Sequence, residues 1–326
     1  MTSDGLLELR SPTMVVRCRP AWGFAITALE DPSTGVNALW TRRGHEPAEF
    51  IRSLGAGGDD STDSFLDRFV GGWFDMFPSV GHPGVVAGIP TQLHGEVPRL
   101  PWITVSADAS HVEARVRTLR TPFEVVRRLE VHDDGVLVKM TIKNVGRESA
   151  PYAWGFHPCF DRAAFAGGRI HIDADSAEVP APAYDPANSL LRDGQEFIWP
   201  HAVRSDGSPS DVSQIPLERD GRHEHICLTL RTGKMVVTAP ALDRWFALTV
   251  EPEVFPYVLL WEDFGAAGAS FWGEADVFTL EPSTNPGRGM DDAVRAHTVR
   301  TLEPRQEIQT TASAVWGRGE PPHDLS

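Results

Sequence analysis

The chain has 326 residues, of which 41% are hydrophobic, enough to bury a sizeable core. Acidic residues number 45 against 30 lysines and arginines, so the formal net charge is −15. Because an acidic surface repels polyanions, the composition argues against nucleic acid and anionic membranes as partners. It argues more weakly against a phosphorylated or sulfonated substrate.

The cellular compartment is indicated by cysteine usage and by the absence of targeting signals. Cys18, Cys159 and Cys227 are widely spaced and odd in number, which favours reduced thiols over a disulfide framework. Residues 1–10 are not typical of a secretory signal, and no stretch approaches the ~20 apolar residues that span a bilayer. We therefore expect a soluble, cytoplasmic protein.

Alternation of apolar and polar residues predicts strands along most of the chain. Residues 123–131 and 136–142 flank an Asp-Gly turn and predict a hairpin. A second hairpin is expected around the turn Thr232-Gly233-Lys234, and a short helical turn at 291–296. The other expected strands are 13–18, 23–28, 102–105, 111–119 and 245–250.

The organisation expected from this pattern is all-β. Glycines and prolines are spread throughout, as in many short strands joined by turns, and no internal repeat or linker is evident. We predict one antiparallel domain over residues 1–316, with large sheets packed on each other, and a polar tail over 317–326. Residues 205–216 are expected to form a surface loop.

Gly71-Gly72-Trp73-Phe74-Asp75 interrupts the alternation. Paired glycines permit close backbone approach, an aromatic face can stack on a sugar, and a carboxylate can accept hydroxyl protons. The alternative for this segment is a buried turn with Trp73 in the core.

Two further segments contain groups that transfer protons near neutral pH. His94-Gly95-Glu96 could be an acid–base pair, half of a metal site or a surface loop. His157 lies among the aromatic residues Trp154, Phe156 and Phe160, where a histidine in the core or at an interface is the alternative to a catalyst.

Glu281 follows the apolar run 277–280. A carboxyl that is partly buried at a strand end can have a raised pKa, which would suit a general base. The alternative is an ordinary strand-terminal glutamate, since Glu-Pro recurs at Glu303.

His223-Glu224-His225 is a competing constellation, because residues two apart on a strand face the same way and can bind one metal. A cupin-type metal enzyme would add His94 and Glu96. The charged residues 219–222 instead favour a solvated hairpin, so no metal is predicted. No dinucleotide- or phosphate-binding glycine motif is present, and no cofactor is predicted.

Taken together, these segments resemble the aldose 1-epimerase (galactose mutarotase-like) family over about residues 23–314. The landmarks are 71–78, 94–102, 154–158, 280–284 and the closing 302–307. The resemblance implies a galactose mutarotase-like β-supersandwich with a concave sugar site. It also implies an isomerase that interconverts the α and β anomers of a free aldose.

The resemblance implies a role for each candidate residue. Glu281 would be the general base, His157 the general acid that protonates the ring oxygen, and His94 a second imidazole near that oxygen. The residues assigned to substrate binding are Trp73, Asp75, Glu96, Trp154 and Trp261.

The ligand expected is a monosaccharide, bound by a monomer or homodimer. No arginine cluster lies near His94-Gly95-Glu96, which favours a neutral aldose. Three alternatives stay open: a non-catalytic sugar-binding or regulatory protein of the same fold, a metal-dependent cupin-type epimerase or isomerase, and a lyase or epimerase acting at carbon.

Overall fold

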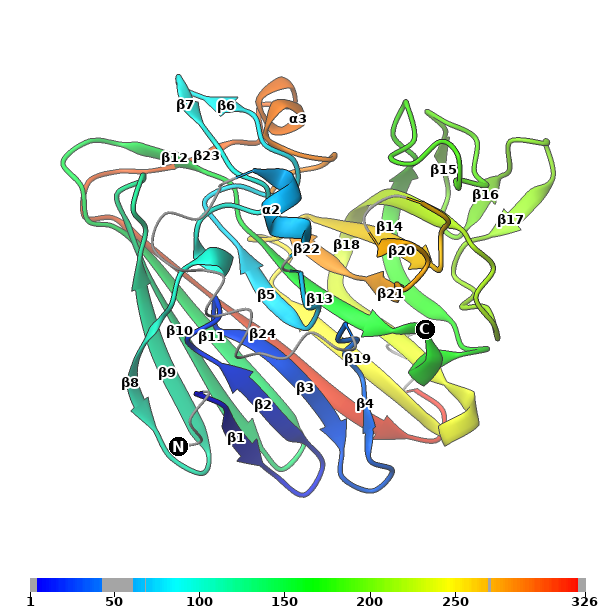
Figure 1. Cartoon of the computed structure of the whole chain (residues 1–326), viewed down its shortest axis with the longest axis horizontal. Helices are drawn as coiled ribbons and strands as arrows, with labels where there is room; N and C mark the ends of the chain where they lie inside the picture. The colour runs from blue at the N-terminus through cyan, green and yellow to red at the C-terminus, as the bar shows by residue number, and fades with distance from the viewer. Residues whose placement is uncertain (1–4, 43–60, 68, 269–270, 322–326) are drawn as a thin grey trace.

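The computed structural model describes residues 5–42, 61–67, 69–268 and 271–321. Antiparallel strands make up most of this part of the chain (Figure 1). The predicted all-β class is therefore confirmed. The helical segments described are α2 (Thr62–Asp67), α3 (Met290–Arg295) and the 3-10 turns η1 (Val97–Arg99), η2 (Arg162–Phe165) and η3 (Pro240–Leu242).

One layer is a continuous antiparallel run in the order β8-β9-β10-β11-β24-β19. The hairpin predicted around Asp134-Gly135 is observed as β10 and β11. The bounds of these strands are β8 (Ile103–Ala107), β9 (His111–Arg117), β10 (Phe123–His132), β11 (Gly135–Asn144), β24 (Glu307–Arg318) and β19 (Arg244–Val250).

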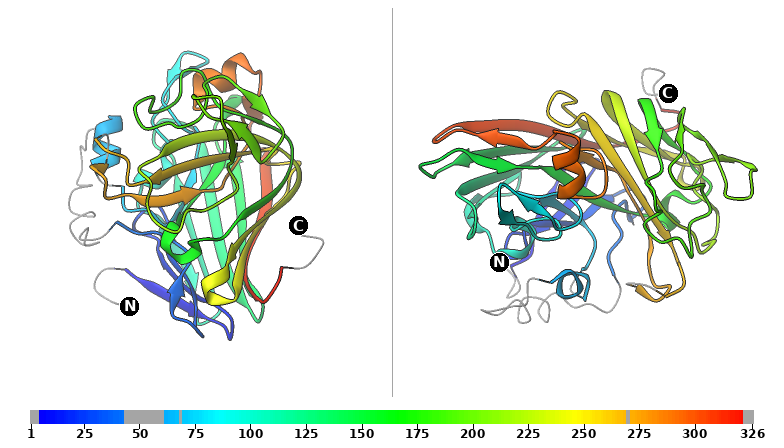
Figure 2. Two further views of the ribbon diagram at one scale, coloured as in Figure 1. Left: turned by 90° about the vertical axis from the view of Figure 1, so that its right-hand side faces the viewer. Right: turned by 90° about the horizontal axis from the view of Figure 1, so that it is seen from above.

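The second layer runs β1-β2-β3-β5-β13 and continues through β21 and β22 to β20, while β4 pairs with β3. Figure 2 shows the layers from two further directions. The bounds are β1 (Leu7–Arg10), β2 (Val15–Arg19), β3 (Ala25–Asp31), β4 (Val36–Asn37), β5 (Trp73–Met76), β13 (Gly155–Asp161), β20 (Tyr257–Phe264), β21 (Asp276–Thr279) and β22 (Glu281–Ser283).

The long strand β18 (His223–Ala239) joins the two layers. Its first half pairs with β20 and its second half with β19, while β14 (Ile170–Glu178) lies along it and also pairs with β15 (Glu196–Phe197). The hairpin predicted around Gly233 is therefore wrong. A Cβ at Gly233 would lie 1.8 Å from the Val250 carbonyl oxygen, so this glycine permits close strand approach rather than a turn.

Three small two-stranded sheets lie outside these layers. They are β6 (Val85–Val86) with β7 (Ile89–Pro90), β12 (Ala150–Tyr152) with β23 (Arg300–Leu302), and β16 (His201–Val203) with β17 (Pro209–Asp211). The expected loop 205–216 thus includes β17. The expected tail begins within β24, and residues 322–326 lie outside the described residues. Among the described residues, no helix is long and apolar enough to cross a membrane.

The main core lies between the two layers. Phe77 of the second layer packs on Phe123 of β10, with ring centroids 4.9 Å apart. Successive strand residues point to opposite faces, so β5 sends Trp73 into this core and Phe74 to the outer face. Phe74 lies opposite His157 of β13. The outer face of the second layer is therefore where the candidate site forms.

Candidate active site

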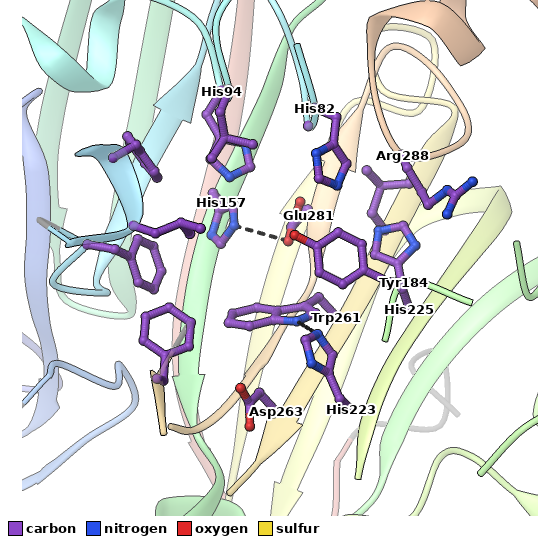
Figure 3. Close-up of a pocket in the computed structure, with 17 residues that line it drawn as sticks. His82, His94, His157, Tyr184, His223, His225, Trp261, Asp263, Glu281 and Arg288 are labelled. Carbon is purple, nitrogen blue, oxygen red and sulfur yellow. Dashed lines mark hydrogen bonds and ion pairs between the residues drawn. The ribbon is translucent and has the colours of Figure 1, made fainter. Parts of the chain in front are cut away.

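A pocket opens on the outer face of the second layer, and strands β13, β18, β20 and β22 contribute to it (Figure 3). Its open volume, with the mouth and the solvent in it included, is about 720 Å³. One wall is apolar and contains Phe65, Leu66, Phe69, Leu93 and Phe271. The rest is rich in histidines, so the pocket combines proton-transfer groups with surfaces on which a ring can lie.

His157 and Glu281 meet in this pocket. His157 Nε2 lies 3.3 Å from Glu281 Oε1, and each side chain is 5% exposed. Glu281 also accepts a hydrogen bond from Thr279 Oγ1 at 2.7 Å, and Cys159 Sγ lies 3.3 Å from His157 Nδ1. Strands β13 and β22 therefore hold an imidazole and a carboxyl within reach of one proton.

Burial shifts both members of this pair toward their neutral forms. It raises the pKa of Glu281 to about 8, although the Thr279 hydrogen bond opposes the rise. It lowers the pKa of His157 to about 3. Over the interval between these values, the pair holds one proton in total, so one group can donate while the other accepts.

His94 lies beside His157, with ring centroids 4.8 Å apart and planes at 73°. Its backbone N–H donates to the Gly81 carbonyl at 3.0 Å, and its φ is +58°. The next residue, Gly95, has φ +81°, and a Cβ there would lie 2.3 Å from the Phe77 carbonyl oxygen. The glycine of the His-Gly pair thus lets the loop approach β5 and presents the imidazole to the pocket.

The His157 ring is held in place by stacking. Phe74 lies parallel to it, with centroids 4.6 Å apart and planes at 16°. The three residues expected to be catalytic, Glu281, His157 and His94, therefore line one pocket.

Trp261 also lines the pocket, and its indole is fixed by a polar chain. Trp261 Nε1 donates to His223 Nε2 at 2.6 Å, so the second ring nitrogen of His223 is assigned the proton. That nitrogen lies 3.4 Å from Asp185 Oδ2. Of the five residues assigned to substrate binding, Trp261 is the one that lines this pocket.

Trp73, Asp75 and Trp154 instead lie in the core, each 0% exposed. On β5 and β13, Asp75 pairs with Phe156 on the core face, while Phe74 pairs with His157 on the pocket face. Asp75 Oδ2 lies 3.1 Å from Arg127 Nη1 of β10. The strand period therefore places these three residues on the face opposite the pocket, and we no longer assign them to substrate binding.

Glu96 has a structural environment as well. Its Oε2 accepts from the Leu119 and Arg120 N–H groups at 2.6 and 2.9 Å, and its Oε1 accepts from Thr121 Oγ1 at 2.7 Å. Four of the five residues assigned to substrate binding thus lie in the core or hold a loop, outside the pocket.

His223 and His225 do not form the solvated hairpin that the charged sequence favours. Both line the pocket, whereas Glu224 accepts hydrogen bonds from the Leu190 N–H at 2.5 Å and Ser189 Oγ at 2.8 Å. Pairing with β20 buries this end of β18. No group of three or more potential metal ligands occurs in the described ranges, and Glu96 is bonded elsewhere.

Several pocket residues were not found from the sequence: His82, Tyr184, Asp263 and Arg288. His82, Tyr184 and Arg288 come from loops without a motif, and Asp263 lies in β20, one residue before its end. The alternation within β20, which places Leu259, Trp261 and Asp263 on one face, was the available signal for Asp263.

Comparisons with known proteins give a fold but no family. No family profile matches the chain, and no curated protein matches it. A candidate aldose 1-epimerase from Escherichia coli K12 has 16% identity and TM-score 0.69, with 96% of this chain and 99% of that chain covered. A galactose mutarotase-like protein from Lactobacillus casei has 18% identity and TM-score 0.61, with 96% of this chain and 100% of that chain covered. Another, from Clostridium acetobutylicum, has 14% identity and TM-score 0.66, with 96% of this chain and 95% of that chain covered.

These likenesses confirm the predicted galactose mutarotase-like fold. They cover nearly the whole chain, and the paired layers of antiparallel strands agree with them. At identities below 20%, they establish the architecture alone.

Proposed function

We propose that the protein is an aldose 1-epimerase-like isomerase that interconverts the α and β anomers of a free aldose. The observation that supports this best is the buried pair of His157 Nε2 and Glu281 Oε1, 3.3 Å apart in the pocket with His94 beside them. The names of the structural neighbours are consistent with the proposal.

Ring opening requires a base at the anomeric hydroxyl and an acid at the ring oxygen. In the proposed reaction, Glu281 takes the proton of the C1 hydroxyl, the C1–O5 bond breaks as C1=O forms, and His157 gives a proton to O5. Rotation about C1–C2 presents the other face of the aldehyde. Closure returns both protons, so the enzyme is regenerated without a cofactor.

In the free pair the shared proton rests on Glu281, so this cycle requires its transfer to His157 when a sugar binds. Neutral Glu281 with neutral His157, and carboxylate with imidazolium, contain the same number of protons. The hydroxyls of an entering sugar give the carboxylate new hydrogen-bond donors, which favours the charged arrangement needed to start the reaction. No proton from bulk water is required.

The remaining contacts would orient the ring. The Trp261 indole, fixed by His223, offers a flat surface for sugar C–H groups. His94 lies next to His157 and would hold the ring oxygen or a neighbouring hydroxyl. Positioning of this kind lowers the barrier because the acid and base are already aligned.

The test is anomer exchange by NMR on a panel of aldoses. Glu281→Gln should lower exchange by at least ~10²-fold, the usual scale for a lost general base, and retain sugar binding. Glu303→Gln is the matched control, because exposed Glu303 lies outside the pocket and should be near wild type. Wild-type exchange in Glu281→Gln, or equal losses in both variants, would reject the assignment.

The same assay separates the alternatives. Binding without exchange in the wild type would identify a sugar-binding protein of this fold. Loss of exchange with EDTA and its return with zinc or manganese would identify the metal-dependent alternative. The proposed mechanism expects no effect of chelator.

A further inference from the structure

The pocket has a second polar wall, across from His94 and His157 (Figure 3). His82, Tyr184, His225 and Arg288 form it. The Tyr184 ring lies 5.1 Å from His82 and 6.1 Å from His225, measured between centroids. Arg288 is on the same side, with its guanidinium directed away from Glu281 toward the edge of the pocket.

Arg288 has no acidic partner among the described residues. Its Nη1 donates to the Pro182 carbonyl at 2.9 Å, and no carboxylate of the described residues lies within ion-pair distance. Asp292, on the same segment, accepts from the Arg288 backbone N–H at 2.8 Å and pairs with Arg295. In a chain with 45 acidic and 30 basic residues, an arginine without a counter-ion in the pocket is available to a ligand.

Three further polar side chains belong to this wall. His82, Tyr184 and His225 make no side-chain hydrogen bond with the residues that the structure describes, and His225 Nδ1 is buried. Two acidic groups near this wall, by contrast, have hydrogen-bond partners: Asp185, next in the chain to Tyr184, and Asp263, which lines the pocket. Asp185 accepts from Asn188 Nδ2 at 2.6 Å, and Asp263 accepts from the Ala266 N–H at 3.0 Å.

We propose that this wall binds an anionic substituent of the sugar, a carboxylate, phosphate or sulfonate carried at the end remote from C1. The inference rests on the proposed function, since C1 must face Glu281 and His157. A guanidinium with two imidazole N–H groups and a phenol O–H matches the several acceptor oxygens of such a group. Arg288 is far from His94-Gly95-Glu96 in the chain, so the residues around that segment, which favoured a neutral aldose, gave no sign of it.

The test compares matched sugars. Wild-type protein is assayed by NMR exchange with glucose and galactose, and with glucuronate, glucose 6-phosphate and 6-deoxy-6-sulfoglucose, which separate the three anions. At least one anionic sugar should have a kcat/KM about tenfold or more above that of glucose. Arg288→Gln should lower the kcat/KM for that anionic sugar by about 10- to 100-fold, mainly through a higher KM. Its kcat/KM for glucose should stay within about threefold of the wild-type value.

Arg219→Gln is the matched control, since exposed Arg219 also donates to a loop carbonyl, Gly273 at 2.8 Å, but does not line the pocket. Arg219→Gln should leave the kcat/KM for every sugar at the wild-type value. Equal losses on neutral and anionic sugars in Arg288→Gln would overturn the proposal, because Arg288 would then only anchor the Pro182 loop. A wild-type preference for glucose or galactose would overturn it too.

Failure of the proposed function gives a different result. If no sugar shows exchange, calorimetric titration of the wild type and Arg288→Gln with the same sugars tests whether the subsite binds anions. Anion binding that Arg288→Gln abolishes would support the subsite and reject the isomerase activity. Absence of such binding would overturn the subsite.

Discussion

Two buried carboxyl groups lie on opposite faces of the second layer, and their partners differ. Asp75 faces the core, where its Oδ2 is 3.1 Å from Arg127 Nη1. Glu281 faces the pocket, where its Oε1 is 3.3 Å from His157 Nε2. A guanidinium keeps its proton at any working pH, whereas an imidazole readily gives its proton up. The core pair can hold charge, but only the pocket pair can move a proton.

The two carboxyl groups also differ in how strongly a partner opposes the rise in pKa that burial causes. Burial raises the pKa of Asp75 to about 6, with the Arg127 charge opposing the rise. Burial raises the pKa of Glu281 to about 8, where only the Thr279 hydrogen bond opposes it. An uncompensated carboxyl is poor for stability but suits proton exchange with a substrate.

The largest effect is expected from breaking the core pair. Asp75→Asn leaves the fully buried Arg127 guanidinium without its counter-charge and should lower the free energy of unfolding by about 3–5 kcal/mol. Urea unfolding at neutral pH measures it. The double variant Asp75→Val with Arg127→Met removes both charges and should recover most of the loss. A loss below about 1 kcal/mol in Asp75→Asn would show that the pair is not a structural ion pair.

A substitution in the pocket pair should have the opposite effect on stability. Replacing Glu281 by a residue that cannot ionise should stabilise the fold at the pH values where the buried carboxyl would otherwise have to be kept neutral. The pKa of Glu281 rises from 4.5 when unfolded to about 8 when folded. The contribution of Glu281 to the free energy of unfolding is therefore most favourable below about pH 4.5, and it falls by up to ~1.4 kcal/mol per pH unit as pH rises toward 8.

Glu281→Gln lacks this titration, so its stability relative to wild type should increase between pH 5 and 8. Urea unfolding at several pH values gives the difference, with Glu303→Gln as the control that should show no such trend. A difference that stays constant with pH would mean that Glu281 is not held neutral by burial.

The rate of anomer exchange should depend on pH through the titration of Glu281 as well. The pair holds one proton between about pH 3 and 8, so exchange should be level at neutral pH and fall about tenfold per unit above pH 8. The NMR rate, corrected for uncatalysed exchange, measures this limb. A limb centred near pH 6.5 would instead assign the essential proton to an unshifted imidazole.

The sequence predicted the architecture where local signals were unambiguous. The segment Asp133-Asp134-Gly135 predicted β10 and β11 because a short turn that contains Asp and Gly closes a hairpin, and the structure pairs His132 with Gly135 around the two-residue loop Asp133-Asp134. At Gly233 the same kind of signal failed, because a glycine can also serve a close approach between extended strands. Sequence does not distinguish these uses, since the neighbouring strand is distant in the chain.

The candidate site was predictable in part for a similar reason. His94, His157 and Glu281 lie in motifs beside glycine or proline, and all three line the pocket. Trp73 and Asp75 lie in an equally suggestive motif, but the register of β5 turns them to the core. Register depends on pairing with β13, which a single strand does not reveal.

The smallest effect should come from the one hydrogen bond that tunes the pocket carboxyl. Thr279 Oγ1 donates to Glu281 Oε1 at 2.7 Å and lowers its pKa, while accepting the Trp261 N–H at 3.1 Å. Thr279→Val removes the donor with little change of shape, so the pKa of Glu281 should rise further. The alkaline limb of the exchange rate should then move to higher pH by less than about one unit.

Thr279→Ser keeps the hydroxyl and is the matched control, with a limb expected at the wild-type position. The core pair lies on the other face of the sheet, so Asp75→Asn should not move the limb in whatever fraction folds. A shift to lower pH in Thr279→Val would contradict the assignment of the limb to Glu281, because loss of a donor to a carboxylate can only raise its pKa.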